Sequence, residues 1–166
     1  CDQARFAMSD RGERGFSLIE LVVSVAIVGT LAMVAVPLLE TNAKRQKENE
    51  LRAALREIRA GIDAYKKAAD EGKVEKKSDE SGYPRRLEDL VQGVVNIQDP
   101  AHPKIYLMRR LPRDPLNGDT ALSPAQSWGK RSYASPPDAP AEGADVYDVY
   151  SLSTGTGMNG IPYREW

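Results

Sequence analysis

A long apolar run near the start of the chain limits its fold more than any other feature. Residues 16–39 read FSLIELVVSVAIVGTLAMVAVPLL and hold a single charged side chain, Glu20. A helix rises about 1.5 Å per residue, so about 20 apolar residues cross the ~30 Å hydrocarbon layer of a bilayer. A buried core helix is the alternative, but such a helix is normally shorter and amphipathic. The run therefore predicts a membrane-spanning helix.

A cleavable secretory signal is a second alternative for this run. Signal peptides have apolar regions of about 7–15 residues that end at an A-x-A-like site. The present run is longer, and Met33 stands two positions before its best small residue, Ala35. Lys and Arg in the short flanks set the orientation of a span. Arg11 and Arg14 favour a cytoplasmic N-terminus, whereas the basic residues within 44–47 oppose it.

The averages over the whole chain do not show that its apolar and charged residues are concentrated in different segments. The 166 residues carry a net charge of −1 and a mean hydropathy of −0.49, which are typical of a soluble domain. The near-zero charge gives no general electrostatic reason to bind nucleic acid. The single Cys excludes an internal disulfide framework and a Cys-rich zinc site. His102 lies in an expected loop, where a surface role is favoured over catalysis.

The residues around the start of the run form a specific junction. A short leader ends in Gly15, Phe16 follows, and Glu20 is the fifth residue after the junction. Together with Gly29 and Pro37, this pattern resembles the N-terminal signature of type IV pilins and of the pseudopilins of type II secretion. The resemblance implies that a prepilin peptidase cuts after Gly15 and methylates the new amino group of Phe16. It also implies that Glu20 pairs with the Phe16 amino terminus of a neighbouring copy, and that the helix loosens from Gly29 to Pro37.

Elementary physics supports these roles. A charge at the bilayer centre costs about 2.5–3.5 kcal/mol on insertion scales, so Glu20 needs a partner or a function. The alternative is that Glu20 reaches the cytoplasmic interface, since it lies four residues past Phe16. Pro37 lacks a backbone donor and clashes with the preceding turn, which predicts a kink.

The first fifteen residues are expected to be the leader, with Met8 as the natural start and residues 1–7 as an upstream extension. Removal of the leader would leave a mature chain without cysteine. The disulfide-closed loop of many type IV pilins could then not form, which favours a pseudopilin.

Beyond the run, apolar residues recur at steps of three or four from Leu51 to Ala69, which predicts an amphipathic helix. We expect one helix from about Phe16 to Asp70, stopped at Gly72, with residues 16–39 in the membrane and 40–72 joining the globular part. Its polar stretch at 44–50 is either solvated or sets the register between copies.

The remaining residues, 73–166, are expected to form a Pro-rich globular part, because every Pro except Pro37 lies after Tyr83. The patterns predict a short helix at 85–92 and strands at 105–108, 132–134 and 146–152. The expected fold is α+β: a long N-terminal helix packed on a small antiparallel sheet with Pro/Gly-rich loops.

Three later segments, YPRRLEDLV, YLMRRLPRDP and YDVYSL, together with Trp166, resemble the major (G-type) pseudopilin of type II secretion. The resemblance implies a non-enzymatic filament subunit without a cofactor. It would lie in the bacterial inner membrane with a periplasmic globular part, among membrane lipid. Its partners would be further copies, other pseudopilins, the prepilin peptidase and the inner-membrane assembly platform, but no nucleic acid. A minor type IV pilin and a monomeric membrane-anchored periplasmic binding module remain alternatives.

Two departures from that family stand out. Residues 116–127 separate Asp114-Pro115 from Trp128-Gly129, which suggests an insertion. Relatives hold calcium with acidic residues after the last strand, but residues 153–160, STGTGMNG, have no carboxylate. We therefore expect that the calcium site is lost or weakened, that no residue of this chain serves as a metal ligand, and that loop hydrogen bonds or packing of Tyr163 and Trp166 replace the ion. The G-x-G-x-x-G within this segment is expected to be a turn, because a dinucleotide site needs a helix inside a βαβ unit and only six residues, Pro162 among them, follow Gly160.

Overall fold

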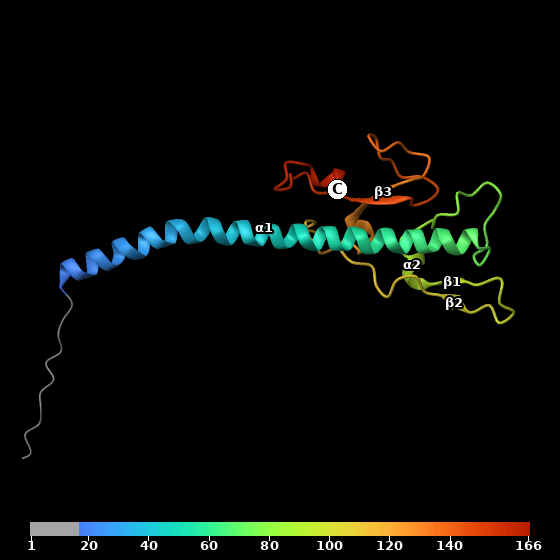
Figure 1. The fold of residues 1–166 in the computed structure, drawn as a ribbon, viewed down its shortest axis with the longest axis horizontal. Coiled ribbons are helices and arrows are strands. Elements are labelled where there is room, and N and C mark those ends of the chain that lie inside the picture. Colours follow the sequence, from blue (N-terminus) through green and yellow to red (C-terminus); the bar gives the residue numbers. More distant parts are fainter. Residues whose placement is uncertain (1–16) are drawn as a thin grey trace, which may run out of the picture. The chain divides into compact units, whose positions relative to one another are not determined.

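The computed structural model describes the backbone of residues 17–166 and the side chains of all of these except Val34, Val36 and Pro37. Its longest element is helix α1, Leu18–Asp70, with 53 residues (Figure 1). The predicted long helix with its end at Asp70 is thus confirmed. The chain falls into two compact units, one up to Asn42 and one from Ala43 to Trp166.

Helix α1 ends in a glycine cap. Gly72 has a φ of +73°, which a residue without a Cβ adopts readily. The Gly72 N–H donates to the Ala69 carbonyl at 3.0 Å and the Lys73 N–H to the Ala68 carbonyl at 2.9 Å. This pair of bonds is a Schellman motif, and it confirms the stop predicted at Gly72.

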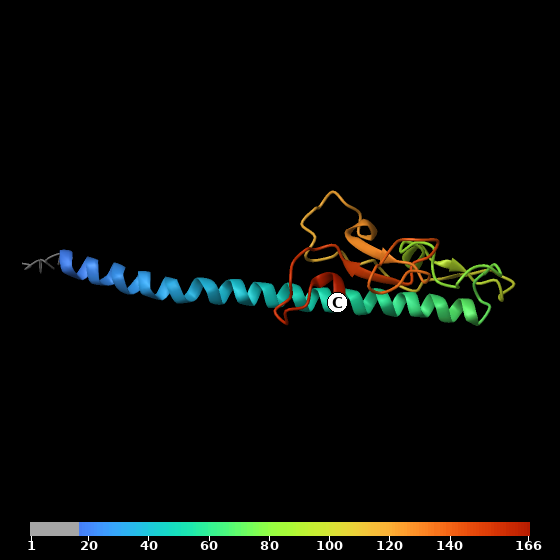
Figure 2. The same cartoon turned by 90° about the horizontal axis from the view of Figure 1, so that it is seen from above.

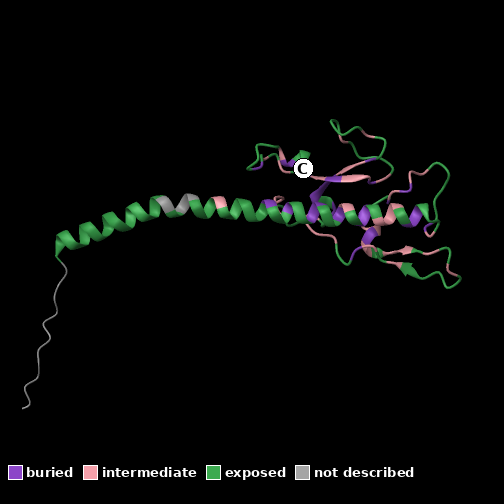
Figure 3. Ribbon diagram, viewed as in Figure 1, coloured by how far each residue is buried: buried purple, intermediate pink, exposed green. Residues whose placement is uncertain are grey.

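In the first unit, α1 is long and apolar enough to cross a membrane, and its apolar side chains are exposed (Figure 3). The helix continues through both Gly29 and Pro37. The kink expected at Pro37 and the loosening after Gly29 in a filament stay predictions.

The second unit carries two small antiparallel sheets. In one, β1 (Val94–Val95) pairs with β2 (Lys104–Ile105). In the other, β3 (Trp128–Arg131) pairs with β4 (Asp148–Ser151), with Gly129 opposite Tyr150. The short helices are α2 (Asp89–Gln92), η1 (Ala125–Ser127) and η2 (Tyr163–Glu165). These elements confirm the α+β class, and Figure 2 shows the strands on one side of α1.

Some predicted boundaries were wrong. No strand forms at 132–134, because the Ser132 N–H donates to the Ala141 carbonyl and the chain then turns. The strand expected at 105–108 is limited to Ile105, since the N–H groups of Leu107 and Met108 both donate to the Leu90 carbonyl. The helix expected at 85–92 begins at Asp89. The strand predicted at 146–152 contains β4 and is confirmed.

The core of the second unit lies between α1 and the strands. The helical stripe predicted from Leu51 supplies one side, and the other side comes from α2, β3, β4 and η2. Its largest fully buried side chain is Trp128, whose Nε1–H donates to the Pro112 carbonyl at 2.9 Å. The buried members are Leu51, Ala54, Leu55, Ile58, Ile62, Leu87, Leu90, Met108, Ala125, Trp128, Val146, Val149 and Tyr163.

Candidate functional site

The surface of α1 in the first unit is one candidate site. From Leu18 to Glu40, every side chain that the structure describes is exposed. The hydroxyls of this stretch are satisfied within the helix: Ser24 Oγ donates to the Glu20 carbonyl at 2.7 Å, and Thr30 Oγ1 to the Ala26 carbonyl at 2.6 Å. A continuous apolar helix surface of this kind is stable in lipid or against other helices.

The structure describes only some of the residues that are expected to take part in processing and assembly. Gly15 and Phe16 lie outside the described residues, so cleavage and methylation stay predictions. Glu20 lies in the first turn of α1 with its side chain exposed. At Gly29, an added Cβ would meet no atom within 4 Å, so nothing in the described part of this chain requires a glycine there.

A second candidate site joins the C-terminal segment, residues 153–166, to α1. Glu48 is its centre, because its side chain is buried and its Oε1 accepts two hydrogen bonds from this segment. The donors are the Met158 N–H at 2.8 Å and the Tyr163 hydroxyl at 2.9 Å. Burial, and then the hydrogen bond to Glu48, raise the pKa of the Tyr163 phenol above its ordinary value.

Three basic residues of α1 hold the same segment. Lys44 Nζ donates to the Thr156 carbonyl at 2.9 Å, and Arg59 Nη2 donates to the Trp166 carbonyl at 2.7 Å. The Arg52 guanidinium lies 4.3 Å from the centroid of the Trp166 ring, within the range of a cation–π contact. We call the four charged residues of α1 the C-terminal clamp: Lys44, Glu48, Arg52 and Arg59.

Sequence reasoning missed this clamp. A solvated helix was one of two interpretations for residues 44–50, and it fails at Glu48, which is 3% exposed. The spacing of Lys44, Glu48 and Arg52 places them on one helix face, and this was the available signal. Their partners, however, are separated from them by more than 100 positions in the sequence.

Residues 153–160, the loop in which the family resemblance implies calcium, hold no carboxylate. Ca²⁺ takes about six to eight oxygen ligands, with carboxylates prominent among them. In this loop, Ser153 Oγ accepts from the Gly155 N–H and Asn159 Oδ1 from the Ile161 N–H, so these oxygens already have donors. Within residues 17–166, no group of three or more His, Cys, Asp or Glu side chains could hold a metal ion.

The glycines of this loop allow its tight turn and its close packing. The Gly157 N–H donates to the Ile161 carbonyl at 2.9 Å, and the Gly160 N–H donates back to the Gly157 carbonyl at 3.0 Å. A Cβ on Gly157 would overlap the Trp166 ring. The interpretation of G-x-G-x-x-G as a turn is confirmed, and His102 is exposed in its loop as expected.

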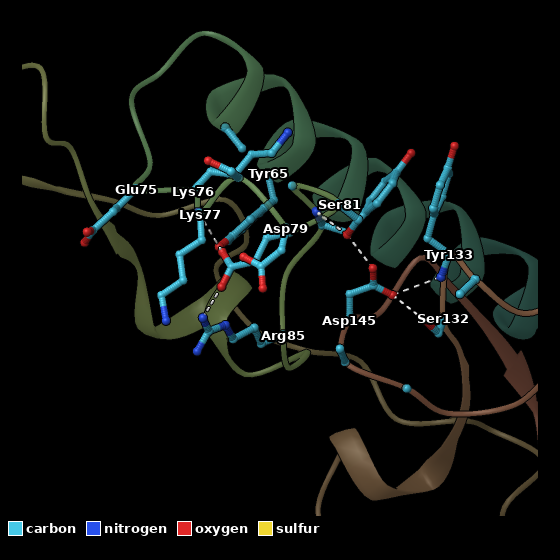
Figure 4. A pocket seen from close by; sticks show the side chains of 18 residues that line it. Tyr65, Glu75, Lys76, Lys77, Asp79, Ser81, Arg85, Ser132, Tyr133 and Asp145 are labelled. Atoms are coloured by element: carbon cyan, nitrogen blue, oxygen red, sulfur yellow. Dashed lines mark hydrogen bonds and ion pairs between the residues drawn. The ribbon is translucent and has the colours of Figure 1, made fainter.

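An open pocket lies beside the last turns of α1, between the loops around residues 75–85 and 132–145 (Figure 4). At its edge, Tyr83 stacks on Tyr133 with ring centroids 5.6 Å apart, and Tyr147 meets both rings edge-on. Inside it, Arg85 pairs with Glu80. These three tyrosine rings, called the tyrosine group below, therefore hold the two loops together.

Asp145 connects the same loops through hydrogen bonds. Its carboxylate accepts from the Ser81 hydroxyl, from the Ser132 hydroxyl at 2.7 Å and from the Tyr133 N–H at 2.9 Å. Burial alone would raise the pKa of Asp145, but these hydrogen bonds outweigh it and hold the pKa below its ordinary value. Asp145 thus joins the two loops through three hydrogen bonds.

Comparisons of the sequence with known proteins show which proteins this chain resembles. The family model for the prokaryotic N-terminal methylation motif matches residues 10–36. The chain is 30% identical to type II secretion system core protein G of Klebsiella pneumoniae, over 80% of this chain and 91% of the relative. It is 27% identical to the protein of the same name from Dickeya chrysanthemi, over 91% and 95% of the two chains. No solved structure shows a significant match.

Proposed function

Because the chain belongs to the family of type II secretion system core protein G, and is therefore a pseudopilin subunit of such a system, we propose that it polymerises into a pseudopilus whose growth drives protein export. The observation that carries the proposal is the first unit of the structure. Its helix exposes apolar side chains along residues 18–39 and presents a single carboxylate there, that of Glu20. Such a surface serves first as a membrane anchor and then as the contact between packed copies.

Processing is the first step of this proposal. A prepilin peptidase cuts after Gly15 on the cytoplasmic side and methylates the new amino group of Phe16. Arg11 and Arg14 favour retention of the leader in the cytoplasm, so the unit from Ala43 to Trp166 lies in the periplasm.

Assembly is the second step. Inside the apolar layer, the Glu20 carboxylate attracts the amino terminus of a neighbouring Phe16, because opposite charges interact far more strongly at low dielectric than in water. At Gly29, the open space found in one chain allows another helix to approach closely, as small residues do in packed membrane helices. The other pseudopilins and the inner-membrane assembly platform are the partners of this step.

The second unit acts as a structural part and not as an enzyme. Its pocket is lined by groups that bind one another: Asp145 with Ser81 and Ser132, and Arg85 with Glu80. A pocket whose side chains hold its own loops together suits a structural role better than acid–base chemistry.

Two measurements on cells that assemble the filament test the proposal. Mass spectrometry of the mature chain should find N-methylated Phe16 as the first residue; an unmodified terminus upstream of Phe16 would contradict processing. Membrane cross-linking should give a ladder of oligomers for the wild type. Glu20→Gln should keep membrane insertion and lose the ladder, whereas the matched control Glu40→Gln, at the end of the apolar run, should keep both.

The alternatives give different results in the same experiments. A monomeric anchored module would give no ladder even in the wild type. A normal ladder in Glu20→Gln would refute the pairing role, and export that is unaffected by loss of the subunit would refute the role in secretion.

A further inference from the structure

The C-terminal segment poses a physical problem that the proposed function does not address. Residues 153–166 contain three glycines and, apart from the short η2, no helix or strand of their own. Ordering such a segment costs backbone conformational entropy at every residue. Its end is nevertheless fixed, since Tyr163 is 4% exposed and belongs to the core.

The clamp on α1 supplies the compensating contacts at several points along the segment. Lys44 holds Thr156, Glu48 holds Met158 and Tyr163, and Arg52 and Arg59 hold Trp166 (contacts given above). Because Lys44, Glu48 and Arg52 are four residues apart, one rigid helix face presents them in register.

Glu48 has the central position in this arrangement. It is a buried carboxylate, and such a charge is stable only when it is hydrogen-bonded and compensated. The two hydrogen bonds to Oε1 meet the first need. For the second, Lys44 and Arg52 lie one turn before and one turn after Glu48 on the same helix face and place positive charge near it. Hydrogen bonds to a charged group are also stronger than neutral ones.

We propose that Glu48, between Lys44 and Arg52, takes the structural place of a bound divalent cation, so that the C-terminal segment is fixed to α1 without calcium. The central charge is negative here, whereas in a cation site it is positive. A cation gathers carbonyl and carboxylate oxygens, whereas here a carboxylate gathers an N–H and an O–H. The ammonium group of Lys44 already occupies the Thr156 carbonyl oxygen, and it repels an approaching cation.

The proposal is independent of polymerisation and is tested on the full chain in detergent micelles. Thermal unfolding is followed through the near-UV circular dichroism of Trp128 and Trp166, in excess calcium chloride and in excess chelator. We expect the same midpoint in both. A midpoint that calcium raises saturably by several degrees would overturn the proposal.

Variants and local amide exchange test the role of Glu48 itself. In Glu48→Gln, the amides of residues 153–166 should exchange about tenfold faster or more, since losing one charge-assisted bond weakens the local structure by at least about 1.4 kcal/mol. The matched control Glu57→Gln, exposed on the same helix, should leave them unchanged. Unchanged exchange in Glu48→Gln would refute the proposal.

A milder variant covers the case in which Glu48→Gln does not fold. Tyr163→Phe keeps the buried ring and removes one donor to Glu48, so it should accelerate exchange in the same segment without unfolding the core. Exchange at the wild-type rate in Tyr163→Phe would count against the clamp.

Discussion

Arg59 on helix α1 donates its Nε–H to Asp148 Oδ1 on strand β4 at 2.7 Å. The same guanidinium donates through Nη2 to the carbonyls of Val149 and Trp166, at 3.2 Å and 2.7 Å. One planar side chain therefore joins the long helix to the second sheet and to the C-terminal segment. The fork of donors on arginine suits this task, and a lysine ammonium cannot reproduce it.

Replacing Arg59 should loosen all three attachments. We expect Arg59→Ala to lower the free energy of unfolding of the second unit by about 1–3 kcal/mol, because three hydrogen bonds are lost at a partly solvated site. Arg59→Lys should recover only part of this loss. Urea denaturation of the full chain in detergent measures the effect, with the exposed Arg56→Ala as the matched control. Equal losses in the Arg59 and Arg56 variants would contradict the bridging role.

Gly129 should not tolerate a side chain. It pairs with Tyr150 across β3 and β4, and an added Cβ would overlap the Tyr150 ring. Gly129→Ala should therefore push this ring away and destabilise the second unit by about 1–3 kcal/mol, the usual cost of overpacking. At Gly118 an added Cβ meets no atom within 4 Å, so Gly118→Ala should have little effect. The difference between their urea midpoints tests the prediction.

The same glycine shows why the sequence predicted some elements and not others. The helical stripe beginning at Leu51 repeats over several turns, so its burial and the end of α1 at Asp70 could be predicted. Strand β3 is the short stretch WGKR, whose pairing depends on how Tyr150 packs over Gly129. No local pattern carries that information, and the strand was predicted at 132–134, directly after the end of β3.

For the candidate sites too, residues in local patterns could be predicted, whereas residues that depend on distant contacts could not. The junction at Gly15 and the carboxylate of Glu20 are local patterns, so they could be found from the sequence alone. Glu48 lies in a stretch that is polar on every side, and only its contact with Tyr163, distant in the sequence, explains its burial. Arg113 behaves likewise: its guanidinium donates to two carbonyls of residues 116–127, the predicted insertion.

Acid should loosen the loops around the tyrosine group. Asp145 has a lower pKa in the folded chain than in the unfolded one. Between these two pKa values the unfolded chain binds more protons, so the contribution of Asp145 is complete above the ordinary value of about 3.9 and is lost as the pH falls below it. The near-UV circular dichroism of the tyrosines should therefore decline in acid. Asp145→Asn should weaken this dependence, and the exposed Asp138→Asn should not. Identical acid profiles for both variants would contradict the prediction.

Alkali should release the C-terminal segment through Tyr163. Its pKa is raised in the folded chain, so its contribution is complete below the ordinary value of about 10 and is lost as the pH rises through the higher folded value. The reason is that a phenolate would lose the proton it donates and would face the Glu48 carboxylate across 2.9 Å. Since the rings of Tyr163 and Trp166 lie 5.0 Å apart, indole fluorescence should change as the segment detaches. Tyr163→Phe cannot ionise and should show no such alkaline transition, whereas Tyr106→Phe, at an exposed position just after β2, should retain it. A transition that survives in Tyr163→Phe would assign the release to another group.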